Sequence, residues 1–77
     1  GIPEGSRVLL IHKNVPGIVS NITNLISGRG INIQNMLNKS KGDMAVTVLE
    51  LSQQPDETLL AALGKLNNVV RARYIPA

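Results

Sequence analysis

The chain has 77 residues and a mass of 8.2 kDa, which is enough for one small domain. Hydrophobic residues make up 43% of the sequence and charged residues 17%, which is the composition of a folded domain and not of a disordered segment. The sequence contains no cysteine, which excludes disulfides, thiolate metal sites and thiol catalysis.

The net charge is +3, but the eight lysines and arginines occur singly along the chain. Nucleic-acid-binding surfaces normally cluster their basic residues, so we expect no nucleic-acid partner. No apolar run approaches the ~20 residues that a membrane span needs, and residues 1–6 lack the layout of a signal peptide. We therefore expect no membrane association and a cytoplasmic location.

Residues 1–6 have the composition of a linker or N-terminal extension. The chain begins without methionine, which suggests a domain excised from a longer protein. We expect one folded domain over residues 7–77.

The first half of the chain predicts a strand followed by a helix. Residues 7–12 form a nearly continuous apolar run, typical of a strand that is buried on both faces and central in a sheet. Apolar residues recur at helical spacing over residues 18–26. Pro16 suits the first helical position and Gly30 suits a C-terminal cap.

The second half predicts a hairpin, a helix and a final strand. Residues 31–40 are followed by a short turn and by the alternating strand 44–51. Asp56 and Glu57 stand where a helix N-terminus favours acids, before leucines that share one helical face. In the last strand, Val70, Ala72 and Tyr74 alternate with arginines, which indicates one dry face and one wet face.

The element order βαββαβ predicts an α+β fold of the ferredoxin-like, or split βαβ, type: a four-stranded antiparallel sheet with both helices on one face. Strands one and three carry apolar residues on both of their faces. Central strands are often rich in such residues. Alternatively, the open face of the sheet serves self-association or docking on another domain.

The sequence offers little material for catalysis. One histidine, no cysteine and five acids do not suffice for a catalytic triad or a metal cage, so we expect no enzyme activity, cofactor or metal in this chain. Gly28-Arg29-Gly30 resembles part of a phosphate loop, but it follows a helix and precedes a strand, which is the reverse of the required context. RNA-binding domains of this topology need exposed aromatic residues, and this chain has only Tyr74.

The turn after the first strand is the best candidate for a ligand site. His12 and Asn14 lie two residues apart, so their side chains can project to the same side of the loop. Pro16 sets the entry to the helix, and Gly17 lets a carboxylate approach the N–H groups of the first helical turn. The alternative is that Asn14 caps the helix and His12 is merely exposed.

Three segments together resemble the ACT domain at the C-terminus of D-3-phosphoglycerate dehydrogenase. They are Ile11-His12-Lys13-Asn14-Val15-Pro16-Gly17, Gly30-Ile31-Asn32-Ile33 and Val70-Arg71-Ala72-Arg73. The resemblance covers residues 7–75. An Asn-x-Pro-Gly turn followed by Gly-x-Asn-Ile is characteristic of ACT domains, and the preceding Ile-His favours the dehydrogenase branch.

The resemblance implies a regulatory module that pairs with a second copy edge to edge through its second strand. L-serine, as feedback inhibitor of serine biosynthesis, would lie between the two copies. His12 and Asn14 of one copy, with the backbone near Pro16 and Gly17, and Asn32 of the other copy would hold it. The resemblance also implies an NAD-dependent catalytic region outside this chain.

Two features separate the chain from serine-responsive relatives, which carry aromatic residues where residues 35–40 and 43–45 have none. Two other functions therefore stand beside the leading hypothesis of a serine-binding regulatory domain. One is a ligand-free oligomerisation module of the same enzyme. The other is the effector domain of a transcription regulator.

Overall fold

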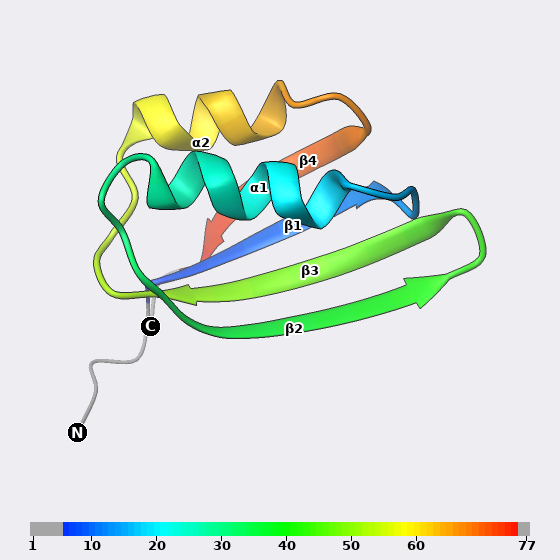
Figure 1. Cartoon of the computed structure of the whole chain (residues 1–77), viewed down its shortest axis with the longest axis horizontal. Coiled ribbons are helices and arrows are strands. Elements are labelled where there is room, and N and C mark those ends of the chain that lie inside the picture. The colour runs from blue at the N-terminus through cyan, green and yellow to red at the C-terminus, as the bar shows by residue number, and fades with distance from the viewer. Residues whose placement is uncertain (1–5, 76–77) are drawn as a thin grey trace.

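The computed structural model describes residues 6–75 as one βαββαβ domain (Figure 1). The linker expected at residues 1–6 lies outside the described residues except for Ser6, and so do residues 76–77. In chain order the elements are β1 (Arg7–Lys13), α1 (Ile18–Ser27), β2 (Ile33–Lys41), β3 (Met44–Leu51), α2 (Glu57–Gly64) and β4 (Val69–Ile75).

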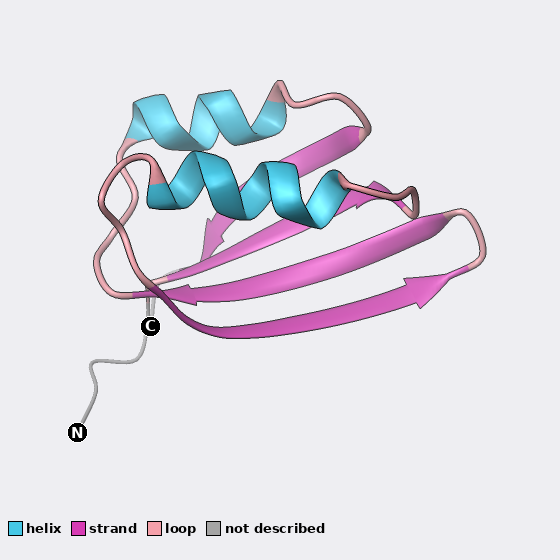
Figure 2. Cartoon of the chain, in the orientation of Figure 1, coloured by secondary structure: helices cyan, strands magenta, loops and turns pink. Residues whose placement is uncertain are grey.

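The four strands form one antiparallel sheet in the order β2-β3-β1-β4. Both helices pack on the same face of the sheet, and the other face carries no element of the described chain (Figure 2). This confirms the predicted ferredoxin-like fold and the central position of β1. The edge strands are β2 and β4, and the face without helices is called the open face below.

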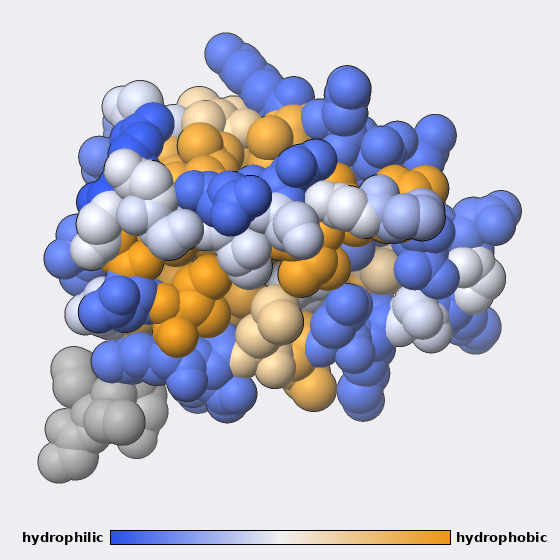
Figure 3. Space-filling model, in the orientation of Figure 1, coloured by the Kyte–Doolittle hydropathy of each residue, from blue (hydrophilic) through white to orange (hydrophobic). Residues whose placement is uncertain are grey.

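The core lies between the sheet and the helices because each strand buries every second side chain on that side. Burial of each large aliphatic side chain contributes about 1.5–3 kcal/mol. Figure 3 shows apolar side chains between the helices and the sheet, and hydrophilic ones over the outer surface. The core consists of Val8, Leu10, Ile18, Ile22, Ile26, Ile31, Leu49, Leu51, Leu59 and Leu63.

The two helices begin differently. In α2 the carboxylate of Asp56 accepts a hydrogen bond of 2.7 Å from the backbone N–H of Leu59, as the acids at this helix start predicted. In α1 the N-cap is Gly17, with φ of 83° and no capping side chain. Pro16 therefore precedes the helix, and the expectation that it occupies the first helical position was wrong.

Two element boundaries differ from the sequence prediction. Helix α1 ends at Ser27 with Gly28 at its C-cap, so Gly30, with φ of 77°, shapes the following turn instead. Strand β2 begins only at Ile33, two residues after the buried Ile31. These shifts arise because side-chain patterns locate a buried face better than they locate the ends of an element.

Strand β4 keeps the expected alternation from Arg71 to Tyr74 but contains an irregularity at Val70. His12 pairs with Val69 and Ile11 pairs with Arg71, so Val70 is an extra residue in the ladder. Val69 packs on the core, whereas Val70 is 62% exposed. The prediction that Val70 lies on the dry face was therefore wrong.

The first and last strands lie side by side at the centre and edge of the sheet, with Arg7 opposite Ile75. The chain thus enters β1 and leaves β4 at the same end of the sheet (Figure 1). No helix within residues 6–75 is long and apolar enough to cross a membrane.

Candidate functional site

His12 lies inside the domain and not in the loop. Its position in β1 points the ring to the helix side of the sheet, where the residue is only 1% exposed. Nδ1 lies 2.9 Å from the carbonyl oxygen of Lys13, and Nε2 lies 2.7 Å from the Thr47 hydroxyl. The expectation that His12 and Asn14 share one side of the loop was wrong, and so was the alternative of an exposed histidine.

A row of polar side chains leads from His12 to the edge of the sheet. Thr47 lies on β3, is fully buried, and has its hydroxyl 3.4 Å from Oδ1 of Asn38 on the edge strand β2. A carbonyl oxygen can only accept, so Nδ1 of His12 donates to Lys13, and in a neutral ring Nε2 then accepts from Thr47. In that tautomer the ring and Oδ1 of Asn38 share the one hydroxyl proton of Thr47. His12, Thr47 and Asn38 are called the polar row below.

Sequence reasoning did not select Thr47 or Asn38. The signal for Thr47 was a polar residue on the buried side of an alternating strand, where its neighbours on that side are Ala45 and Leu49. Asn38 carried no comparable signal, because all of β2 after Ile33 is exposed in a single chain.

Asn14 is exposed and fixes the turn between strands instead of capping the helix. Its backbone N–H donates to the carbonyl oxygen of Asp43 at 2.8 Å, and its side-chain amide donates to that of Gly42 at 3.3 Å. The first turn of α1 therefore lacks a capping side chain. Its N–H groups are available to a carboxylate or to water.

The backbone conformation at position 17 requires a glycine. Its φ of 83° lies in the left-handed region, and a Cβ built there would meet no atom within 4 Å. The space beside Gly17 is therefore open in the described chain. The conformation, and not crowding, accounts for the glycine.

Asn32 lies far from Asn14 within one chain. Its backbone N–H and carbonyl oxygen both bond to Ser52, just beyond the end of β3, and its side-chain amide makes no hydrogen bond within residues 6–75. Lys13, beside Asn14, pairs with the first residue of β3, whereas Ile33, beside Asn32, pairs with the last. Asn14 is thus level with Asp43 and Asn32 with Ser52, so at ~3.3 Å per residue the two asparagines are about 30 Å apart along the sheet.

The described residues hold no group of three histidine, cysteine or acidic side chains that could bind a metal ion. The polar groups at both ends of the sheet are amides, hydroxyls and backbone N–H groups. They can hold a small polar ligand by hydrogen bonds.

Comparison with known proteins supports a regulatory fold. The family model for the AHAS small subunit-like ACT domain matches residues 8–71. The solved ACT domain of the GTP pyrophosphokinase of Chlorobium tepidum is 19% identical, with a TM-score of 0.74 over 90% of this chain and 94% of that one.

Two dehydrogenases resemble the chain in sequence. It is 24% identical over 78 residues to the D-3-phosphoglycerate dehydrogenase of Archaeoglobus fulgidus, and 26% over 73 residues to that of Escherichia coli K12. These alignments cover 96% and 92% of this chain but only 15% and 18% of the dehydrogenases. The chain therefore spans less than a fifth of the length of either relative.

The fold and these matches define the class of protein: a small regulatory module. The chain belongs to the ACT domain family, in its AHAS small subunit-like group.

Proposed function

We propose that this ACT domain is the amino-acid-binding regulatory domain of a cytoplasmic, NAD-dependent D-3-phosphoglycerate dehydrogenase, and that L-serine binds between two copies of it. The observation that carries the proposal is the placement of Asn14 and Asn32 at opposite ends of the sheet, beside an unpaired edge strand. One chain cannot bring the two amides to one ligand. Two chains can.

The edge strand supports this arrangement. β2 is nine residues long, and every residue after Ile33 is exposed, so its outer backbone groups are a template for another strand. In a symmetric dimer the two β2 strands pair antiparallel, which brings the start of one to the end of the other. A register centred on Leu37 places Asn32 opposite Gly42 of the second copy, whose carbonyl oxygen holds Asn14.

The chemistry at that junction suits an amino acid. The uncapped N-terminus of α1, entered through Pro16 and Gly17, favours a carboxylate by about 0.3–1 kcal/mol. Hydrogen bonds from Asn14 and Asn32 to the charged ligand contribute about 1.5–3 kcal/mol each. His12 contributes through the polar row, since direct contact of its ring with a ligand requires Thr47 to release it.

Calorimetric titration of the chain with L-serine, followed by other amino acids, tests the proposal. A specific ligand at 100 times its dissociation constant raises the free energy of unfolding by about 2.7 kcal/mol. We expect Asn14→Ala and Asn32→Ala each to weaken binding at least about tenfold, which is the loss of 1.4 kcal/mol or more. Thr58→Ala, an exposed change on α2 at the far edge, is the control. Unchanged affinity in both asparagine variants would remove the site.

A mixing experiment tests the shared site directly. Asn14→Ala and Asn32→Ala copies each lack one half of every site. A mixed dimer regains one intact site, so an equal mixture should bind with wild-type affinity at about a quarter of the sites. The mixture must first be shown to exchange subunits. If no sites with wild-type affinity then appear, the two amides do not form a site shared between two copies.

A ligand-free assembly module is the second candidate, and one observation favours it. Met36 and Leu37 on the edge strand are 46% and 56% exposed, and apolar contacts of this kind can hold a dimer without any ligand. Light scattering separates the two functions. An assembly module dimerises equally well with and without amino acids, and shows no calorimetric response to them.

A further inference from the structure

The fold gathers the basic residues that the sequence distributes singly. Strand alternation and register place six of the eight lysines and arginines on the open face of the sheet, and all six are exposed. Clustering along the chain was therefore the wrong test for a basic surface in this fold. The six residues are Arg7, Lys13, Lys39, Lys41, Arg71 and Arg73.

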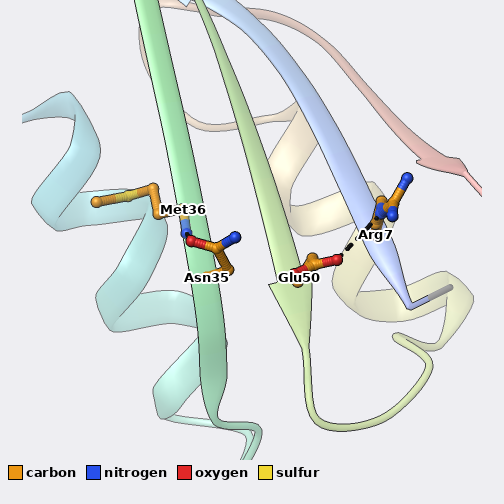
Figure 4. A network of polar contacts seen from close by, with 4 residues as sticks. All are labelled: Arg7, Asn35, Met36 and Glu50. Atoms are coloured by element: carbon orange, nitrogen blue, oxygen red, sulfur yellow. Dashed lines mark hydrogen bonds and ion pairs between the residues drawn. The ribbon is translucent and has the colours of Figure 1, made fainter. Parts of the chain in front are cut away.

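The strands bring one acid to this face. Among the four described strands Glu50 is the only acid, and its carboxylate pairs with Arg7 at 3.2 Å. Figure 4 shows Asn35, Glu50 and Arg7 on the same side of three neighbouring strands, while Met36 points toward the helices. Five cations thus remain without an acidic neighbour in the strands.

The centre of the open face is apolar. Leu9, Ile11 and Val48 are half-buried there, and Val46 is 38% exposed. Two shallow hollows of about 320 and 300 Å³ meet at Ile11. Basic side chains border both: Arg71 and Arg73 in the first hollow, and Lys39 and Lys41 in the second.

We propose that the open face is a docking surface for a partner protein whose contact surface has an apolar centre and a rim of aspartates and glutamates. Charge complementarity selects this occupant. A second copy of the chain would bring two basic rims together. A nucleic acid would satisfy the rim, but it would cover the apolar centre with phosphates, and Tyr74 is the only aromatic side chain available for base stacking. The surface exists in one copy and does not depend on the serine site.

Synthetic amphipathic peptides test the proposal. The first has a leucine stripe flanked by glutamates, the second replaces these leucines with serines, and the third replaces the glutamates with lysines. Amide shifts of the ¹⁵N-labelled 77-residue chain locate binding. We expect the leucine–glutamate peptide to shift residues of β1, β3 and β4 on the open face, and the other two to bind at least tenfold more weakly, which is 1.4 kcal/mol.

Matched variants complete the test. The double variant Arg71→Glu, Arg73→Glu should bind the leucine–glutamate peptide with at least tenfold lower affinity. Val46→Thr should lower this affinity measurably. Lys65→Glu, the same charge reversal on the helix side of the domain, should leave binding unchanged. Circular dichroism of each variant confirms the fold.

Four results would overturn the proposal. They are absence of binding by the leucine–glutamate peptide, shifts confined to the helices, equal binding of the serine–glutamate peptide or of a single-stranded oligonucleotide, and equal binding of the leucine–lysine peptide.

Discussion

At the scale of single residues, the histidine is the point at which sequence and structure differ most. The pattern Ile-His-Lys-Asn suggested two neighbouring ligand groups, but a strand sends successive side chains to opposite faces and continues to Lys13. His12 faces the core, whereas Asn14, one residue beyond the strand, is exposed. The sequence identified both residues. It could not locate the end of the strand, which decides where each points.

The buried contact between His12 and Thr47 makes a stability prediction. Thr47→Val keeps the shape of the side chain and removes the hydroxyl, which leaves Nε2 of a 1%-exposed ring without its partner. The free energy of unfolding should fall by about 1–3 kcal/mol, as measured by urea denaturation.

Thr58→Val on the exposed face of α2 is the matched control, and it should change stability by no more than about 0.5 kcal/mol. Equal effects of the two substitutions would show that the hydrogen bond contributes nothing in solution.

At the scale of elements, periodicity predicted all six helices and strands in order, but not their ends. Where a cap had a chemical signature, as at Asp56, the helix start was predictable. At α1 the sequence suggested Pro16 as the first helical residue. The helix instead begins at Ile18, because Gly17 adopts the left-handed conformation and is the N-cap. The extra residue at Val70 left no signal, because a bulge shifts the alternation by one without changing composition.

Two glycines at helix ends should respond to alanine with opposite signs. Gly17→Ala forces a side chain into the left-handed region, at a cost of about 1–2 kcal/mol. Gly64→Ala, in the last turn of α2 with no atom within 4 Å of the new Cβ, should stabilise by up to about 1 kcal/mol. Thermal unfolding measures both, and the same sign for both would contradict the backbone assignment.

At the scale of the whole molecule, neither the shared face of the cations nor the distance between Asn14 and Asn32 is visible along the chain. Both depend on which strands are neighbours. Residue types predicted a polar ligand site, and the strand order β2-β3-β1-β4 determines that its two halves lie at opposite ends of the sheet. The fold class was predictable because every element carried its own pattern. The partner surfaces were not, because they combine residues from several strands.

The proposed dimer has its own test. Leu37→Asp, in the middle of β2, places two like charges near the two-fold axis and removes apolar contact area, so dimerisation should weaken at least about tenfold. Light scattering over a concentration series measures this. Val70→Asp, equally exposed on the opposite edge strand, should leave the dimer intact. The reverse result would move the interface to β4.

The pairing of Arg7 with Ile75 has a consequence for how this domain can be built into other proteins. Residues opposite each other in an antiparallel ladder have Cα atoms only about 5 Å apart. The domain could therefore be inserted into a loop of a host protein, because the two ends of the interrupted loop would stay close together. Circular permutation is open for the same reason: a short peptide joining residues 7 and 75, with new termini at the exposed Gly42 turn, should preserve the fold.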